Sequence, residues 1–134
     1  MIIVSSDSKK YISVGGADTW QTLCSTIHYH LGSHKNEITH VWNFLKTGHC
    51  AKFDCLNAAK EFNLVRDALS AIKPDQIVYD ENDPTRLPPW GKEISPVITS
   101  CSNYLTSGDG DDLLAELVKL FTYAAYVKAD IDLK

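Results

Sequence analysis

The sequence predicts a helix-dominated α+β fold in a single domain over residues 1–134, with a small sheet built from N-terminal, middle and C-terminal short strands. Three observations support this fold class. The length of 134 residues matches one domain. Apolar residues recur at helical spacing in several longer segments, whereas short β-branched segments lie near both ends. Finally, 44% hydrophobic and 22% charged residues are typical of a globular protein.

Three predicted strands come from the first and last residues. Met1–Ser5 and Lys10–Val14 are short apolar segments rich in β-branched residues, separated by a polar turn, which favours two strands in a hairpin. Ala129–Leu133 alternates in polarity and places Ile131 and Leu133 on one side, as a terminal strand does.

Two helices are expected between these strands. Asp18 and Gln21 have the spacing of a capping box, so the first helix begins there and ends before Gly32. A strand remains the alternative for this segment, because it is rich in Thr, Tyr and Trp. Asn36 is the expected cap of a second helix, which ends before Gly48. The apolar side chains expected in the core from these helices are Trp20, Leu23, Cys24, Ile27, Leu31, Ile38, Val41, Trp42 and Leu45.

The clearest helix of the first half begins after Asp54 and ends at Lys73, because the residue before a proline is pushed out of the helical region. Gln76–Tyr79 is the expected middle strand, and Asp80–Gly91, with three prolines, is an ordered surface loop. The buried stripe of the helix is Cys55, Ala59, Phe62, Val65, Leu69 and Ile72.

Two more helices are expected in the second half. Ser95 followed by a proline predicts a helix start, and this helix ends near Gly108. The last helix starts at Asp109, because acidic residues in a first turn favour the helix dipole. Residues 55–72 and 110–128 are expected to be the two longest helices and to share one core with Trp20 or Trp42. The predicted core face of the last helix is Leu113, Leu114, Leu117, Phe121, Ala124 and Val127.

The charge of the chain differs between its halves. Residues 1–67 hold seven Lys or Arg and six Asp or Glu, a net charge of +1, whereas residues 68–134 hold six and eleven, a net charge of −5. Because nucleic-acid binding needs cations to replace counterions, this balance counts against a nucleic-acid partner. An acidic half can instead attract a basic protein. The plainer interpretation is a solvated surface that keeps the protein soluble.

The sequence predicts a cytoplasmic protein without a membrane partner. No apolar stretch approaches the roughly 18 residues that a membrane span needs. Met1–Val4 is apolar but too short for a signal-peptide core and lacks a basic flank. The four cysteines are therefore expected to be reduced thiols.

A zinc-binding enzyme in the His- and Cys-rich segment 28–55 is the rival interpretation. Zinc needs three or four nitrogen or sulfur ligands, and a cysteine pair separated by four residues is wider than usual. Phosphate-binding glycine loops and nucleophile elbows are absent from the sequence. We therefore expect no catalytic residues, no metal and no cofactor. In the rival interpretation, the zinc ligands would come from His28, His30, His49, Cys50 and Cys55.

A tryptophan between prolines and glycine marks the polar loop. Pro88 and Pro89 fix the backbone before Trp90, and Gly91 permits an unusual angle after it. A tryptophan on a rigid loop is typical of a binding hot spot. The alternative is a side chain folded back to cover the core.

The segment Leu87–Pro96, followed by Asn103–Ser107 and Asp109–Leu113, resembles the immunity protein 70 family of bacterial polymorphic-toxin systems, which includes contact-dependent growth inhibition. Gly48–Phe53 and Asn57–Phe62 fit the same pattern, so the resemblance covers roughly residues 48–134. It implies an immunity protein that binds and neutralises a cognate toxin in the cytoplasm and has no catalytic residues to carry over.

The acidic half leads us to expect a basic toxin, and a nuclease with a positive substrate groove is one toxin class of this kind. The interface could instead lie in residues 1–47, and a general protein-interaction adaptor without a toxin is a further alternative. The first-ranked toxin-binding residues are Asp80, Glu81, Asp83, Trp90 and Glu93, and the second-ranked are Asp109, Asp111 and Asp112.

Overall fold

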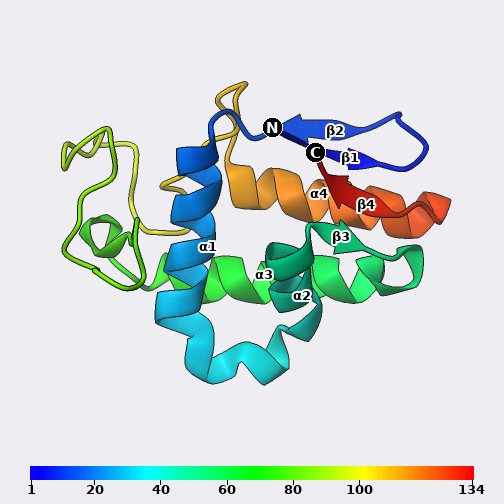
Figure 1. Ribbon diagram of the computed structural model, residues 1–134, viewed down its shortest axis with the longest axis horizontal. Coiled ribbons are helices and arrows are strands. Elements are labelled where there is room, and N and C mark those ends of the chain that lie inside the picture. Colours follow the sequence, from blue (N-terminus) through cyan, green and yellow to red (C-terminus); the bar gives the residue numbers. More distant parts are fainter.

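The computed structural model describes all residues, 1–134, as helices packed around one core with a small antiparallel sheet at one side (Figure 1). The predicted α+β class is confirmed. The α-helices are α1 (Ala17–Leu31), α2 (Thr39–Thr47), α3 (Cys55–Ser70) and α4 (Leu113–Val127). The strands are β1 (Ile2–Ser5), β2 (Tyr11–Ser13), β3 (His49–Cys50) and β4 (Ile131–Leu133). Short 3-10 helices cover Gly32–Glu37, Lys52–Asp54 and Pro74–Gln76.

The sheet has the strand order β2-β1-β4-β3, and every pairing is antiparallel. The predicted hairpin of β1 and β2 and the terminal strand β4 are confirmed. Ile3 pairs with Ile12 on one side and with Leu133 on the other, so the first and last segments lie side by side (Figure 1). The middle strand is β3, where Cys50 pairs with Ile131.

The prediction of a strand over Gln76–Tyr79 is wrong. This segment lies against α1, and its backbone groups bind side chains of that helix. The Thr26 hydroxyl both accepts from the Val78 N–H (3.1 Å) and donates to the Val78 carbonyl (3.2 Å), while the Gln21 amide donates to the Tyr79 carbonyl (3.0 Å). Because helix side chains satisfy these groups, the segment needs no strand partner.

The prediction of a helix from Ser95 to Gly108 is also wrong, because turns occupy this region. The Asn103 carboxamide accepts from the N–H groups of Thr99 (3.0 Å) and Ser100 (3.1 Å) and donates to the Val97 carbonyl (3.1 Å). Short polar side chains of this kind compete with helical hydrogen bonding.

Two predicted caps are corrected. Asp18 lies inside α1, which begins after Gly16, and its carboxylate accepts from the Tyr79 hydroxyl at 2.6 Å. Asn36 lies in the preceding 3-10 helix rather than at the start of α2. Gly48 ends α2 in the left-handed conformation (φ 73°), as the sequence predicts.

The start of α4 also differs from the prediction. The helix begins at Leu113, and Asp112 is its cap because the carboxylate accepts from the Ala115 N–H at 3.2 Å. Asp109 and Asp111 lie in the turn before the helix.

The core lies between α3, α4 and the helices beside them. Phe44, Phe62 and Phe121 are fully buried, and the Phe121 ring lies 5.0 Å from Phe44 and 5.1 Å from Phe62 between centroids. Trp20 contacts the Phe44 ring edge-on at 6.0 Å, which confirms a tryptophan beside this core. Val127 is 39% exposed, so its predicted core position is wrong.

The lengths of the helices correct one further expectation. With 16 residues α3 is the longest, but α1 and α4 have 15 each. None of the helices is long and apolar enough to cross a membrane.

Candidate functional site

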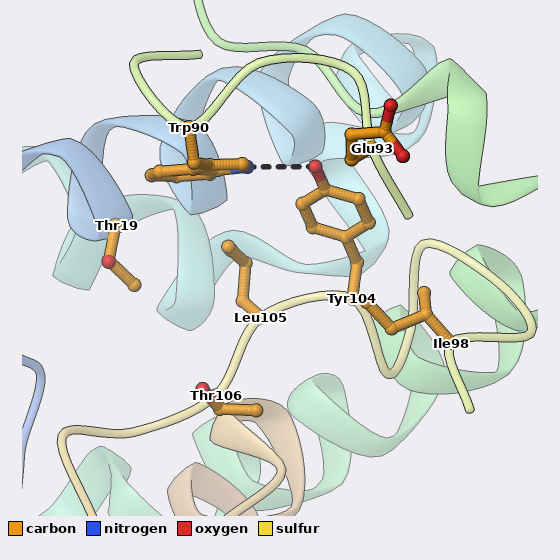
Figure 2. Close-up of a pocket in the computed structure, with 7 residues that line it drawn as sticks. All are labelled: Thr19, Trp90, Glu93, Ile98, Tyr104, Leu105 and Thr106. Atoms are coloured by element: carbon orange, nitrogen blue, oxygen red, sulfur yellow. Dashed lines mark hydrogen bonds between the residues drawn. The ribbon is translucent and has the colours of Figure 1, made fainter. Parts of the chain in front are cut away.

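The face around Trp90 is built from the start of α1, the loop Asp80–Glu93 and the segment that leads to α4 (Figures 1 and 2). We call this surface the loop face and define it as residues 80–93 and 104–112 together with Thr19. It contains all eight toxin-binding residues that the sequence predicts.

Trp90 is anchored on one edge and accessible on the rest of its surface. Its Nε1–H donates to the Tyr104 hydroxyl at 2.9 Å, and Tyr104 is buried (Figure 2). Pro88 is buried before it, and Gly91 takes a left-handed φ of 82° after it. With 42% of its surface exposed, Trp90 is held rigidly but is available to a partner.

A pocket of about 240 Å³ opens beside Trp90 (Figure 2). We call it the Trp90 pocket. Its lining combines aromatic, aliphatic, hydroxyl and carboxylate groups, and Glu93 is its one charged residue. The lining residues are Thr19, Trp90, Glu93, Ile98, Tyr104, Leu105 and Thr106.

Two carboxylates of the first-ranked set have basic partners in the structure. Asp80 lies 3.4 Å from the Arg86 guanidinium and also accepts from a backbone N–H of its own turn. Glu81 lies 3.3 Å from Nδ1 of His28 on α1. The Glu81 contact ties the loop to α1, and Arg86 offsets the charge of Asp80 within the loop.

Asp83 and Glu93 differ from them. Asp83 is exposed and accepts from the Thr85 hydroxyl at 2.6 Å. Glu93 is exposed, and its carboxylate has no hydrogen-bond or ion-pair partner within the chain. Glu93 is therefore the carboxylate of the first-ranked set that is most available to an external cation.

The second-ranked acidic residues come shortly after Thr106 in the chain, and Thr106 is part of the pocket wall. Thr106 lines the Trp90 pocket and forms a β-bridge with Asp112. The backbone N–H groups of Asp109 and Asp111 bind the Ser107 hydroxyl, and both side chains are exposed. Of the eight predicted residues, Trp90 and Glu93 line the Trp90 pocket, and Asp112 is linked to its wall through Thr106.

Gly108 fixes this turn against the sheet. Its N–H donates to the Ser13 carbonyl at 2.6 Å, and a Cβ at this position would lie 2.7 Å from the Ser13 hydroxyl oxygen. A larger residue here would require Ser13 to shift, so glycine suits this approach, and the hydrogen bond holds the turn before α4 against β2.

The zinc candidates lie in separate environments. His28 faces Glu81 and stacks near Trp42, His30 contacts the Gln76 carbonyl at 2.7 Å, and His49 contacts Asp132 at 2.7 Å. The Cys50 and Cys55 sulfurs lie 3.8 Å apart. No three His, Cys, Asp or Glu side chains are arranged to hold a metal ion.

All four cysteines are free thiols. Burial raises the pKa of Cys24 and of Cys101 to about 12, with the charge of Glu81 adding to the shift at Cys24 and that of Asp75 at Cys101. These two thiols are therefore held in the neutral, unreactive form.

Sequence reasoning did not find a second exposed apolar surface, at the end where α3 starts and α4 stops. Phe53 is 81% exposed and Tyr126 88% exposed, with Leu56 and Val127 also exposed. The 3-10 helix that contains Phe53 is tied to the end of α4, because the Lys52 N–H donates to Asp130 at 2.8 Å. No motif marks these residues, and their exposure follows from tertiary packing alone.

A rigid acidic face around a half-exposed tryptophan is typical of a protein-binding domain. Comparison with known proteins identifies the kind of binding. A family model described as Immunity protein 70 matches residues 4–133. The chain belongs to the immunity protein 70 family, and such a protein binds a cognate toxin.

The match includes most of the N-terminal third, so the expectation that the resemblance starts near residue 48 is corrected. No curated protein and no solved structure matched the chain in the other two comparisons.

Proposed function

We propose that this immunity protein neutralises its toxin in the cytoplasm by stoichiometric, noncovalent binding, without an enzymatic step, a metal or a cofactor. Family membership supports the binding role. The geometry that supports this proposal is the loop face, where Trp90 is fixed by Tyr104 beside an unpaired carboxylate. A surface that is already ordered loses little conformational entropy when a partner binds.

The proposed partner surface is basic. The C-terminal half carries a net charge of −5, and the loop face contributes seven of its acidic residues. Clustered carboxylates accelerate encounter with a cationic protein. A nuclease, whose substrate groove must be positive to bind phosphate, is the toxin class that suits such a surface, and the loop face would then compete with nucleic acid.

The free thiols support the cytoplasmic location. All four cysteines are free thiols in the structure, including Cys50 and Cys55, whose sulfurs lie 3.8 Å apart. Disulfides form readily in oxidising compartments and are rare in the cytosol.

Co-expression with the toxin domain encoded beside its gene tests the proposal. Cells that express the toxin alone should stop growing, and the wild-type chain should restore growth and copurify with the toxin. Continued growth inhibition despite soluble immunity protein would refute the proposed function. An adjacent gene that encodes no toxin would favour a general adaptor instead.

A further inference from the structure

We infer that the Trp90 pocket receives one arginine side chain of the toxin, an inference that rests on the proposed function. The surface of the loop face that surrounds the pocket would contact the remainder of the toxin.

The lining offers each part of an arginine side chain a suitable contact. Ile98 and Leu105 provide apolar surface for the methylene groups. The Trp90 ring provides a face for a guanidinium, which stacks on aromatic rings more often than an ammonium does. Figure 2 shows the Glu93 carboxylate beyond the Tyr104 hydroxyl and turned away from the Trp90 ring, so Glu93 would meet the guanidinium at the rim of the pocket after rotation of its exposed side chain.

The size of the pocket suits one side chain. Its volume of about 240 Å³ lies below the roughly 300–1,000 Å³ of sites that hold whole small-molecule ligands. A side chain carried by a protein needs less space, because the main body of the partner stays outside.

The negative charge in the pocket favours a positively charged side chain as its occupant. Glu93 is the one charged lining residue and has no partner within the chain, whereas Asp80 and Glu81 already have Arg86 and His28. Within the pocket, an arriving cation would therefore meet one carboxylate, that of Glu93, which no basic group of the chain offsets.

A second pocket on the other side of Tyr104 provides a contrast within the same region. Its volume is about 230 Å³, nearly the same, but it is lined by Arg86 and Lys92 against the single carboxylate of Asp75. Because Arg86 is paired with Asp80, the remaining charged groups of this pocket, Lys92 and Asp75, balance. Two pockets of similar size thus differ in charge, and only the Trp90 pocket is lined by a single carboxylate with no cation beside it.

The Trp90 pocket is also ordered before binding. The 2.9 Å hydrogen bond from Trp90 to the buried Tyr104 hydroxyl holds the indole ring. Because the ring need not be immobilised when the toxin arrives, more of the interaction energy remains for affinity.

Affinity measurements with paired variants test the inference, using the purified full chain and the toxin domain encoded beside its gene. Glu93→Gln removes the charge with little change in shape, and Glu37→Gln, an exposed glutamate on the 3-10 helix after α1, is the matched control. We expect Glu93→Gln to weaken binding about tenfold to a hundredfold, as losing a charged hydrogen bond does, and Glu37→Gln to have no effect.

The arginine is identified by replacing each toxin arginine with glutamine and each toxin lysine with methionine and measuring every variant against wild type and Glu93→Gln. One arginine should show an effect that disappears in the Glu93→Gln background, which is the signature of a direct pair. Trp90→Leu should weaken binding of the same arginine, with folding checked by circular dichroism.

Unchanged affinity of Glu93→Gln and Trp90→Leu for a toxin that still binds would overturn the arginine inference and leave the proposed function intact. Coupling to a lysine instead would overturn the choice of arginine. Failure of the wild-type chain to bind the toxin would overturn the proposed function itself.

Discussion

The carboxylate of Glu61 supplies a helix cap that the local sequence lacks. Glu61 lies on α3, is only 9% exposed, and accepts from the N–H groups of His40 (2.7 Å) and Val41 (3.1 Å) at the start of α2. It also binds the His40 ring. The residue before α2 is Ile38, whose side chain cannot cap. An anion from another helix therefore satisfies the free donors at this terminus.

Replacing Glu61 should destabilise the fold. Glu61→Ala removes the acceptor for two buried N–H groups and should lower the free energy of unfolding by about 2–3 kcal/mol. Glu61→Gln keeps one acceptor oxygen and should lower the free energy of unfolding by less. Urea denaturation measures both, with Glu37→Ala as a surface control. If Glu61→Ala lies within about 0.5 kcal/mol of the parent, the cap contributes nothing to stability.

His49 gives the fold a small dependence on pH. The hydrogen bond with the Asp132 carboxylate raises the pKa of His49 above its usual 6.5, so the folded protein binds this proton more tightly than the unfolded chain. The resulting stabilisation is complete below pH 6.5 and is lost as the pH rises through the folded pKa. Because the pair is half-exposed, we expect at most about 0.5 kcal/mol.

NMR titration of the His49 ring measures this shift. The midpoint should lie above 6.5 in the wild type and fall in Asp132→Asn, which keeps the shape of the side chain but removes its charge. Equal midpoints in the two proteins would contradict the assigned cause.

The helices α3 and α4 carry the core through residues that the sequence pattern predicts. Phe62 and Leu117 are fully buried. Truncating either leaves a cavity, so Phe62→Ala and Leu117→Ala should each lower the free energy of unfolding by about 2–5 kcal/mol. Leu56→Ala on the exposed side of α3 is the matched control and should change it by less than about 0.5 kcal/mol. If chemical denaturation gives the same change in the free energy of unfolding for all three variants, Phe62 and Leu117 are not core residues.

Elements with a clear local polarity pattern were predictable from the sequence, whereas elements that depend on distant partners were not. The stripe from Cys55 to Leu69 repeats over four turns, so its periodicity predicts α3 on its own. The two-residue strand β3 depends on β4, and Gln76–Tyr79 depends on Thr26 and Gln21 of α1. Such segments take their structure from partners distant in sequence, which a local pattern does not contain.

The candidate site shows the same division. The sequence alone makes Trp90 a binding candidate, because proline and glycine fix the chain on either side of it. Its hydrogen bond to Tyr104 and the ion pair of Glu81 with His28 join segments 14 and 53 residues apart. Sequence reasoning therefore named the acidic residues but could not tell which of them are already paired.

At the scale of the whole molecule, the charge on the loop face should govern the rate of toxin association. Replacing Asp80, Glu81 and Asp83 together with lysine should slow association and weaken its dependence on salt, because steering attraction is lost. The fold should survive, since exposed ion pairs contribute roughly 0–1 kcal/mol each. Stopped-flow kinetics over a range of ionic strength measures both effects.

A matched variant tests whether the position of the acidic residues matters, or only the net charge of the protein. Replacing Glu37, Asp54 and Asp67, which are exposed outside the loop face, with lysine makes the same change in total charge. This variant should associate faster than the loop variant. If the loop variant keeps the wild-type rate and salt slope, the loop does not steer the toxin, and the search moves to residues 1–47.

Hydrogen–deuterium exchange of the chain with and without its toxin tests most directly whether the loop face is the binding surface. Loop amides outside regular hydrogen bonding exchange quickly in the free protein, so protection by a partner is readily seen. We predict slower exchange in residues 80–93 and 104–112 upon binding, with little change in Lys52–Leu56 and Tyr126–Lys128. Protection confined to those last two segments would place the toxin on the exposed aromatic end of α3 and α4 and would contradict the account.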